Sequence, residues 1–579
     1  MAIQRLPFGN RIPGVQFTED YILPSVGGTR DTITCIIGTA QTGPVEPTVV
    51  TTLSDFETLF GLPLADNYGI KAANVILPNT IMYVRVCSTG ARVLFKDGSN
   101  NVFQSKQGGV ALQGAQVQVV VEGEVITVIT SQNDEVIETI KCSSNPLDSE
   151  YIFTVFDHYS TNLKLGVSED YTFVDKAFIG TGGTAGATNA TAVADTIEVR
   201  SKYADAKING AVFHLLQNIN GKPYAQLIQD GKVLEEIPVS SNIESIEDFR
   251  LRVGSSSSLI EITKLDAITP VSVTLQGGNA GTSNLVDDDY FDALDKIADP
   301  SIYQIDTLII PGVTSTAVQH KAKTVCEDRG DTIYIADHPL GLRGSLVRDY
   351  VKAQGRFSAN FPLNSQQVAV FSPWVKYNDG NISFYPPSII AAQKLASNDK
   401  EFNVWDSCAG IKRATLNNIA GLEYEPTKSD LNILYNDALV NPIVSLTGKG
   451  FVIWGNKTTK VPVYANAPEP ICSLNVRRLV NYLRKLIYDA TLPFVFDVND
   501  NFTWTSISNV VCPLLDAIKN NRGLDDYVFI CDETINTAEQ IDQLTLNCML
   551  KIRPTRSAEY IDVDLKIYPF TVDFDGGVR

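Results

Sequence analysis

The amino-acid sequence predicts an α/β fold joined to β-rich parts, followed by a C-terminal α+β domain and flanked by extended arms. Residues 306–336 alternate strand-like apolar runs with a helical pattern, which is typical of a parallel sheet covered by helices. Residues 93–285 carry short Val and Ile runs between Gly, Ser, Asn and Thr turns, which is typical of β domains. Residues 475–518 have apolar side chains at helical spacing.

A chain of 579 residues is expected to hold several domains. From changes in composition and pattern we expect an N-terminal extended arm (1–24), the first part of a core domain (25–92), an inserted β-rich domain (93–190), a second inserted β-rich domain (191–285), an α/β domain (286–468), a C-terminal domain (469–567) and a C-terminal extended arm (568–579).

The two ends of the chain share features of extended segments. Residues 1–24 contain three prolines and two glycines and no periodic core pattern, which predicts an arm. Near the other end, residues 560–568 alternate apolar and polar side chains, which predicts a strand. The alternation resumes with Phe570, Val572 and Phe574, which favours a docked end over a frayed one.

The inserted region carries specific turn signals. Val119 to Thr130 is a hairpin candidate around Glu122-Gly123. Asn220-Gly221 and Asp230-Gly231 are further hairpin signals. The Gly, Ala and Thr stretch at 180–194 is typical of a linker or long loop. We expect these domains to face outward, where insertions are tolerated.

The α/β domain begins with a recognisable unit. Asp306–Ile310 has a buried-strand composition, residues 318–326 follow a helical pattern, and residues 332–336 form the next strand. Ser315 is the predicted N-cap of the helix and Gly330 its end.

The C-terminal domain begins with an amphipathic helix. Its apolar side is predicted to be Val476, Leu479, Val480, Leu483, Leu486 and Ile487, and its opposite side carries Arg477, Arg478, Arg484 and Lys485. The four cations are expected to face away from the core. A merely solvated charged face is the alternative interpretation.

A second helix follows, with Trp504 to Ile518 marking its buried side. Pro513 is expected to kink or divide it, and Gly523 is the predicted C-cap. Residues 527–531 and 544–552 are predicted strands.

Composition excludes several classes of protein. A net charge of −19 argues against broad nucleic-acid binding, because a phosphate backbone requires a basic surface. We find neither an apolar run long enough for a membrane helix nor a signal peptide. We therefore expect that the chain does not insert into a membrane and that it is synthesised in a cytoplasm.

The nine cysteines lack metal-type pairing. They are expected to be buried apolar residues, with late disulfides between subunits as the alternative.

Several motifs, taken in order, resemble those of contractile tail sheath proteins of bacteriophages and R-type bacteriocins. At the C-terminal end these are Asn475-Val-Arg-Arg-Leu479, Cys531-Asp-Glu-Thr534 and Arg553-Pro-Thr-Arg-Ser-Ala-Glu-Tyr560; earlier in the chain they are Pro13-Gly14-Val15, Ile36-Ile37-Gly38-Thr39-Ala40, Ser54-Asp55-Phe56, Leu59-Phe60-Gly61, Val84-Arg85-Val86, Ser372-Pro373-Trp374, Pro386-Pro387-Ser388 and Ile453-Trp454-Gly455. No single motif is specific, but their ordered sequence is. The resemblance covers about two thirds of the chain. One departure follows Gly455, where the family usually has Ala-Arg-Thr and this chain has Asn456-Lys457-Thr458. Lys457 keeps the positive charge of the family's arginine but lacks the bidentate hydrogen-bonding geometry of a guanidinium.

The resemblance implies a structural protein with a central subtilisin-like α/β domain. Such a protein polymerises helically around an inner tail tube and contracts to drive the tube through a target cell envelope. Its implied partners are further copies of itself, the inner tail tube protein, and baseplate and tail terminator proteins. The implied location is the virion tail, assembled in the host cytoplasm, and no cofactor is implied.

The subtilisin-like fold makes a hydrolase the alternative function, with a non-contractile filament or surface array as another. A serine hydrolase requires a histidine base and an oriented acid. The four histidines are His158, His214, His320 and His338, and none lies in a recognisable catalytic motif. Gly281-Thr282-Ser283 superficially resembles a nucleophile loop but precedes the α/β region. We therefore expect no enzyme.

Two sets of site residues are predicted. The cations Arg477, Arg478, Arg484 and Lys485 are candidates for contact with the inner tube. The inter-subunit strand-donation candidates are Pro13, Gly14, Val15, Phe17, Phe570, Val572 and Phe574, because extended arms can add a strand to a neighbour's sheet.

Overall fold

The computed structural model describes residues 32–559 with short gaps. The gaps are 62–66, 78, 89–91, 98–99, 109–114, 133–134, 147, 149, 161–162, 166, 168–170, 175, 180–188, 195, 205–208, 218–222, 230–231, 238–244, 258, 276–280, 283–284, 464–468 and 558. Both predicted arms and the predicted final strand therefore lie outside the described residues. The chain divides into two compact units, and the described residues of the smaller one are 402–409 and 462–559.

The larger unit contains a nine-stranded sheet in the order β2-β3-β1-β18-β19-β20-β25-β26-β23. Its strands are β1 (Thr34–Thr39), β2 (Thr48–Val50), β3 (Ile81–Val86), β18 (Thr307–Ile309), β19 (Ile333–Ala336), β20 (Val368–Ser372), β23 (Thr415–Leu416), β25 (Asn441–Leu446) and β26 (Gly450–Ile453). From β3 to β25 every pairing is parallel. The outer strands β2, β23 and β26 pair antiparallel.

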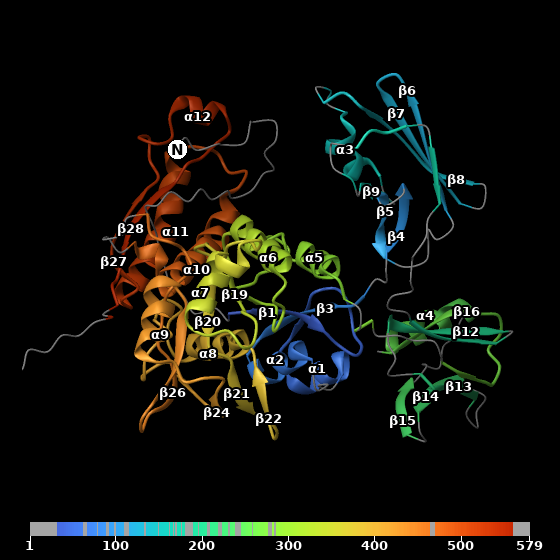
Figure 1. The fold of residues 1–579 in the computed structure, drawn as a ribbon, viewed down its shortest axis with the longest axis horizontal. Coiled ribbons are helices and arrows are strands. Elements are labelled where there is room, and N and C mark those ends of the chain that lie inside the picture. The colour runs from blue at the N-terminus through green and yellow to red at the C-terminus, as the bar shows by residue number, and fades with distance from the viewer. Residues whose placement is uncertain are drawn as a thin grey trace, which may run out of the picture. The chain divides into compact units, whose positions relative to one another are not determined.

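Helices cover both faces of this sheet (Figure 1). They are α1 (Leu53–Phe60), α2 (Tyr68–Ile76), α5 (Asp287–Lys296), α6 (Thr316–Arg329), α7 (Ser345–Lys352) and α8 (Pro387–Glu401). Helices α5, α6 and α7 pack on one face, and α2 and α8 on the other. Because successive strand residues point to opposite faces, a sheet covered twice needs continuous apolar strands. All six residues of β3 are buried, and Arg85 is the one charged residue among them; its Nη1 donates to the Gly43 carbonyl at 2.7 Å.

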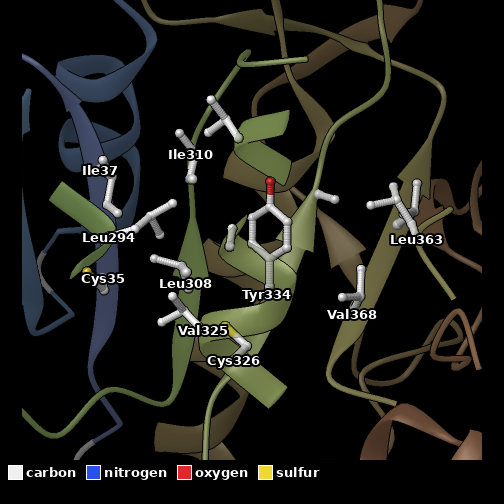
Figure 2. Packing of buried hydrophobic residues seen from close by; sticks show 14 of the residues in the cluster. Cys35, Ile37, Leu294, Leu308, Ile310, Val325, Cys326, Tyr334, Leu363 and Val368 are labelled. Carbon is white, nitrogen blue, oxygen red and sulfur yellow. The ribbon is translucent and has the colours of Figure 1, made fainter. Parts of the chain in front are cut away.

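The core on the α5–α6 side joins segments far apart in the sequence. Cys35 and Ile37 of β1 lie near Leu294 of α5, and the Tyr334 ring lies among aliphatic side chains (Figure 2). The Tyr334 hydroxyl is buried without a hydrogen-bond partner. Figure 2 also shows Val325 and Cys326 of α6 reaching this cluster.

The predicted strand–helix–strand unit is confirmed. Strands β18 and β19 are parallel neighbours, connected by α6. Ser315 occupies the N-cap position, but its hydroxyl donates to Asp287 Oδ2 at 2.8 Å instead of capping the helix. Gly330 ends α6 with φ 65°, a left-handed conformation that glycine adopts without steric cost.

The region between β3 and α5 contains two separate β-rich cores. The first comprises β4 (Arg92–Asp97), β5 (Asn100–Gly108), β6 (Gln116–Glu122), β7 (Val125–Gln132), β8 (Glu135–Ser143), α3 (Ile152–Tyr159), β9 (Leu163–Leu165) and β10 (Lys176–Ile179). The second comprises β11 (Asn189–Ala194), β12 (Ile197–Ala204), β13 (Val212–Gln217), β14 (Pro223–Gln229), β15 (Lys232–Ile237), α4 (Ile246–Ser256), β16 (Ile260–Leu265) and β17 (Val271–Thr274).

The three predicted hairpins in this region are confirmed as strand pairs. Strands β6 and β7 pair around Gly123, and β14 pairs with both β13 and β15. The Ser88 amide donates to the Gly281 carbonyl at 2.7 Å. The chain therefore leaves the sheet and returns to it at one place, which explains how so long an insertion leaves the sheet continuous.

Smaller elements complete the larger unit. Strands β21 (Val375–Asn378), β22 (Ile382–Tyr385) and β24 (Ile419–Leu422) form a three-stranded sheet, and α9 (Lys428–Asn432) runs into a π-helical turn at Ile433–Asp437. The mixed α/β fold with several sheets is thus as predicted.

The smaller unit contains α10 (Leu474–Thr491), α11 (Asn501–Asn520), β27 (Leu524–Ile530), α12 (Ala538–Asp542) and β28 (Met549–Pro554). Pro513 does not divide the helix, because α11 runs without interruption from Asn501 to Asn520; the expected kink stays a prediction. The predicted cap at Gly523 is wrong. Asn521 is the C-cap, and Gly523 is required because a Cβ there would lie 2.3 Å from Ile518 and 3.1 Å from the Trp405 ring.

Candidate functional site

The core of the smaller unit is built from the two helices and the hairpin. Leu479 and Leu483 of α10 pack against Ile507, Val511 and Leu515 of α11, and Leu524 and Ile552 close the cluster from β27 and β28. The spacing of four residues between the contacts on each helix is what a helix face requires. Leu479, Leu483 and Leu486 of the predicted apolar side of α10 therefore pack as expected, whereas Val480 and Ile487 are half-buried and lie outside this cluster.

A short segment from elsewhere in the chain completes this core. Trp405 stacks near Tyr482 with ring centroids 6.1 Å apart, and its indole nitrogen donates to the Asn521 carbonyl at 3.1 Å. Asn475 donates in turn to the Trp405 carbonyl at 3.1 Å. Residues 402–409 thus belong structurally with the C-terminal elements, although they lie in a stretch where the sequence predicts the α/β domain.

The basic side of α10 is not the open surface that the sequence predicts. Arg477, Arg478 and Lys485 are only 0%, 4% and 7% exposed, and Arg484 is half-buried. The Arg477 Nε donates to Asn481 Oδ1 at 2.7 Å, and an Arg478 Nη donates to the Val404 carbonyl at 3.4 Å. The expectation of four outward cations is therefore wrong for three of them. Part of the reason is the 402–409 segment, which lies against this side.

An exposed apolar surface lies instead at the ends of the helices. Phe496, Val498, Phe502 and Leu544 are 87%, 73%, 80% and 83% exposed. Asn499 donates to the Thr545 carbonyl at 3.1 Å and accepts from the Trp504 indole at 2.8 Å, which holds the two loops together. Phe496 and Leu544 have φ values of 78° and 54°, a conformation that side chains of this size rarely adopt. We call these four residues the apolar tip.

Sequence reasoning missed the apolar tip. The available signal was the alternation of Phe494, Phe496 and Val498, followed by Asn and Asp residues and then Phe502. Aromatic residues in a polar turn have no core to enter, and exposed large apolar side chains are candidates for an interaction surface.

The hairpin of β27 and β28 is a two-stranded sheet. Within the described ranges neither strand pairs with a third one. A two-stranded sheet is marginally stable by itself, and its unpaired edges can accept another strand. The strand-donation candidates Pro13, Gly14, Val15, Phe17, Phe570, Val572 and Phe574 all lie outside the described residues, so the structure does not locate them.

The carboxyl ends of the parallel strands hold a buried polar cluster in the larger unit. Asp337, directly after β19, accepts hydrogen bonds from the Ser388 amide at 3.0 Å, the Ser388 hydroxyl at 2.6 Å and the Gly312 amide at 3.0 Å. Burial raises the pKa of the Asp337 carboxyl to about 6, against the effect of these three donors. His338 is fully buried, which lowers its pKa to about 4, and its Nδ1 lies 3.0 Å from the Pro339 carbonyl oxygen.

This cluster brings together Ser388 and Trp374, which end two of the expected motifs, with Asp337 and His338, but it does not form a catalytic triad. Ser388 donates to an acid directly, and the His338 ring is directed to Pro339 rather than placed between them. The Trp374 indole donates to the His338 carbonyl at 2.8 Å, and Tyr68 packs edge-on against Trp374 and directly over Gly312. These aromatic rings fill the edge of the sheet where α/β enzymes usually bind ligands.

The remaining candidates for hydrolase chemistry are separate from this cluster. The His214 Nδ1 lies 2.7 Å from the Ser272 hydroxyl, between two strands of an inserted domain. His320 stacks on Phe361 with centroids 4.4 Å apart. His158 lies on α3, and Ser283 is outside the described residues.

The departure from the expected family motif has a visible structural role. The Lys457 ammonium lies 3.8 Å from the centroid of the Tyr435 ring and donates to the Tyr435 carbonyl at 3.3 Å. A compact ammonium suits this cation–π contact. The Lys457 amide also donates to Asn441 Oδ1 at 2.7 Å, which holds the segment after Gly455 against β25.

Comparison with known proteins identifies the C-terminal region directly. Residues 467–567 match the family model of the phage tail sheath C-terminal domain. The predicted resemblance to tail sheath proteins is confirmed. The chain is 27% identical to the tail sheath protein of Enterobacteria phage T4 over 322 residues, which cover 52% of this chain and 48% of that protein. It is also 27% identical to the tail sheath protein of Vibrio phage KVP40 over 325 residues, covering 51% of this chain and 47% of that protein.

The chain spans about half the length of the tail sheath proteins it matches. These relatives are named as structural components, in agreement with the expectation that the chain is not an enzyme. A solved sheath tail protein from Desulfitobacterium hafniense has a TM-score of 0.48 and 11% identity, and the match covers 90% of this chain and 93% of that one.

In the part of the chain that the structure describes, no helix combines the length and apolarity that crossing a membrane requires. Over the same residues, no group of three or more His, Cys, Asp or Glu side chains is arranged to hold a metal ion.

Proposed function

We propose that this chain is a tail sheath subunit that polymerises helically around an inner tail tube and contracts to drive the tube through a target cell envelope, for genome delivery. The observation that carries the proposal is the match of residues 467–567 to the phage tail sheath C-terminal domain. Energy for contraction is stored in the assembled, extended sheath, so the subunit needs no cofactor or nucleotide.

In this proposal the larger unit is a rigid body and the smaller unit makes the connections. The larger unit would have a subtilisin-like fold whose catalytic positions have been replaced by packing. The cluster around Asp337 supports this role, because the Ser388 hydroxyl is used to bind Asp337 and the Trp374 indole is used to bind the His338 carbonyl. A rigid body of this kind can rotate during contraction without losing its fold.

The proposed links between subunits are extended strands. Residues 1–24 and 568–579 would each add to a neighbour's sheet, and the two open edges of the β27–β28 hairpin are the acceptors we favour. Contacts that run head to tail without closing produce an open helix of subunits. Main-chain hydrogen bonds would then hold neighbours together while the larger units move.

Deleting either arm tests this linkage. We expect each truncated chain to remain a soluble monomer under conditions where the full chain polymerises. A deletion of residues 89–280 is the matched control, because Ser88 and Gly281 already meet across a hydrogen bond of 2.7 Å, and it should leave polymerisation intact. Normal sheaths from both arm deletions would contradict the linkage.

The proposed partners are further copies of this chain, an inner tail tube protein, and baseplate and tail terminator proteins. The proposed location is the virion tail, after assembly in the host cytoplasm. Among the candidate tube contacts, Arg484 is the one supported by its position, because Arg477, Arg478 and Lys485 are buried. An acidic tube surface would complement it, with each surface ion pair contributing up to about 1 kcal/mol.

The tube contact is tested by Arg484→Glu in a co-assembly assay. We expect weaker association of sheath with tube and a loss that depends on salt concentration. Lys519→Glu is the matched control, since Lys519 is an exposed cation of the same unit and pairs with Asp526 at 2.8 Å. Equal behaviour of both variants would show that the α10 charge does not contact the tube.

Electron microscopy of the purified polymer tests the function itself. A contractile sheath should occur in long, narrow and short, wide states. One state only would favour the alternative of a non-contractile filament or surface array. A serine-directed activity probe addresses the hydrolase alternative, and we expect no labelling because Ser388 is fully buried.

A further inference from the structure

The two strands of the β27–β28 hairpin end in a pair of facing cysteines. Cys531 directly follows β27 and Cys548 directly precedes β28. The register pairs Ile530 with Met549, so the two cysteines are the next opposing pair. Their sulfur atoms are 3.4 Å apart. Opposing residues of antiparallel strands have Cα atoms about 4.5–5.5 Å apart, which is within the range that a disulfide spans.

The loop between the cysteines holds them together independently of their sulfur atoms. Asn536, which is buried, donates to the Asp532 carbonyl at 3.2 Å and to the Asn547 carbonyl at 3.0 Å, and it accepts from the Asn547 amide at 2.6 Å. Asp532 is the neighbour of Cys531, and Asn547 is the neighbour of Cys548. One side chain therefore fixes both ends of the loop, and bond formation requires little further ordering of the chain.

The pair is also chemically suited to exchange. The two residues differ in exposure, since Cys548 is exposed and Cys531 is 8% exposed. The hydrogen bond between the sulfurs lowers the pKa of the Cys531 thiol and raises the pKa of the Cys548 thiol. The first proton lost thus leaves a thiolate at Cys531, and the thiolate is the reactive form.

We propose that Cys531 and Cys548 form a disulfide within one subunit when the protein meets an oxidising solution. The oxidant is a small-molecule disulfide. One protein thiolate attacks it, forming a mixed disulfide and releasing one small thiolate, which takes up a proton. The second protein thiol loses its proton and attacks the mixed disulfide, forming the protein disulfide and releasing the second small thiol. Two protein thiols and one small disulfide thus give one protein disulfide and two small thiols.

The bond would tie the ends of β27 and β28 together and close the loop of residues 532–547. Its value to an assembled sheath rests on the proposed function, in which this hairpin accepts strands from neighbours. A reducing cytoplasm keeps the thiols free, and oxidising surroundings outside the cell favour the bond. The bond would link two strands of one subunit. For these two cysteines, this proposal therefore takes the place of the disulfides between subunits that were the alternative expected from the sequence.

The test uses the purified full-length chain in its folded state. It is equilibrated with oxidised or reduced glutathione, alkylated, digested without reduction and mapped by mass spectrometry. We expect a peptide linking Cys531 to Cys548 in oxidised glutathione only. Cys512→Ser, which removes a half-buried cysteine of α11, should retain the link. Cys531→Ser and Cys548→Ser should each abolish it.

Two further readouts separate the possible outcomes. Non-reducing electrophoresis of the oxidised chain should show a monomer, because the bond lies within one subunit. Thermal unfolding should shift upward on oxidation in the wild type and in Cys512→Ser, but not in the two pair variants. Complete alkylation of both cysteines in oxidised glutathione would overturn the proposal, and so would a cross-linked dimer through either of them. None of these measurements requires a polymer, so they are independent of the test of sheath function.

Discussion

The two units of this molecule differ in the charged and aromatic residues that stand out in each. The larger unit contains a buried ion pair held in a hydrogen-bond network. Arg329 and Asp331, with side chains 1% and 5% exposed, form a bidentate pair at 2.9 and 3.0 Å, and Arg329 also donates to the Ile297 and Tyr303 carbonyls. The smaller unit buries three cations along one helix and at the same time exposes Phe496 and Phe502 almost fully.

Under the proposed function, this difference distinguishes a larger unit that is stabilised by its own contacts from a smaller unit that contacts other subunits. Exposed aromatic residues cost stability in an isolated subunit and are recovered only when a partner covers them. The larger unit has no need of a partner for its central network.

Arg329→Met should be the most damaging single change. It leaves the buried Asp331 carboxylate without its counter-ion, and breaking such a pair costs about 3–5 kcal/mol. Chemical denaturation followed by circular dichroism measures this loss. Arg348→Met is the control, because Arg348 pairs with Asp349 and Asp437 at the surface, where a loss of about 1 kcal/mol or less is expected. Equal effects would mean that the network at Arg329 is not what stabilises the larger unit.

Trp405→Ala should destabilise the smaller unit by about 3 kcal/mol or more, through the cavity it leaves beside Tyr482 and Gly523. Tryptophan fluorescence and proteolysis of the 462–559 region would detect the loosened unit. Trp454→Ala is the matched control, since Trp454 is 47% exposed whereas Trp405 is 8% exposed. A similar loss in the control would remove the special role assigned to the 402–409 segment.

The neighbouring groups Asp337 and His338 should give opposite dependences of stability on pH. Burial raises the pKa of Asp337 to about 6, so its folded form binds a proton more tightly than the unfolded chain. Its contribution to stability is present in acid and is lost as pH rises through about 6. Burial lowers the pKa of His338 to about 4. Its contribution is present above the ordinary histidine range and is lost as pH falls toward about 4.

Single variants should reveal these two offsetting contributions. In Asp337→Asn only the histidine remains, so stability should rise more steeply than in wild type between about pH 4 and pH 6. In His338→Gln only the acid remains, so stability should fall over the same interval. Each difference from the wild type should reach about 2–3 kcal/mol, since each pKa is displaced by roughly two units. Parallel profiles for all three proteins, measured by urea unfolding, would contradict the assignment.

Much of the fold is predictable because its signals are local. The apolar spacing of residues 476–487 fixes the packing face of α10, and the strands flanking α6 fix a parallel pair. The turn at Gly123 similarly fixes the β6–β7 hairpin. In each case the residues that interact are close in sequence, so their periodicity carries the information.

The candidate site is less predictable because its contacts are long-range. The Trp405 indole bonds to the carbonyl of Asn521, and Arg478 bonds to Val404. Nothing in the spacing of α10 indicates that a segment from the α/β region will lie against its basic side. The continuity of α11 through Pro513 shows the same limit, because packing of Val511 and Leu515 outweighs the helix hydrogen bond that the proline removes.

Substitutions in the apolar tip should have little effect on the stability of the isolated subunit. They also test the contrast between the two units most directly. Phe496→Ser and Phe502→Ser should change the free energy of unfolding by no more than about 0.5 kcal/mol, because these side chains are 87% and 80% exposed. Polymerisation should nevertheless weaken, because a partner would lose the apolar area it covers.

Val193→Ser is the control, since Val193 is 73% exposed on β11 of an inserted domain. This variant should leave polymerisation unchanged. Light scattering against subunit concentration compares the three variants. If both phenylalanine variants polymerise as the control does, the apolar tip is not a contact between subunits, and the contrast between the two units would rest on the buried cations alone.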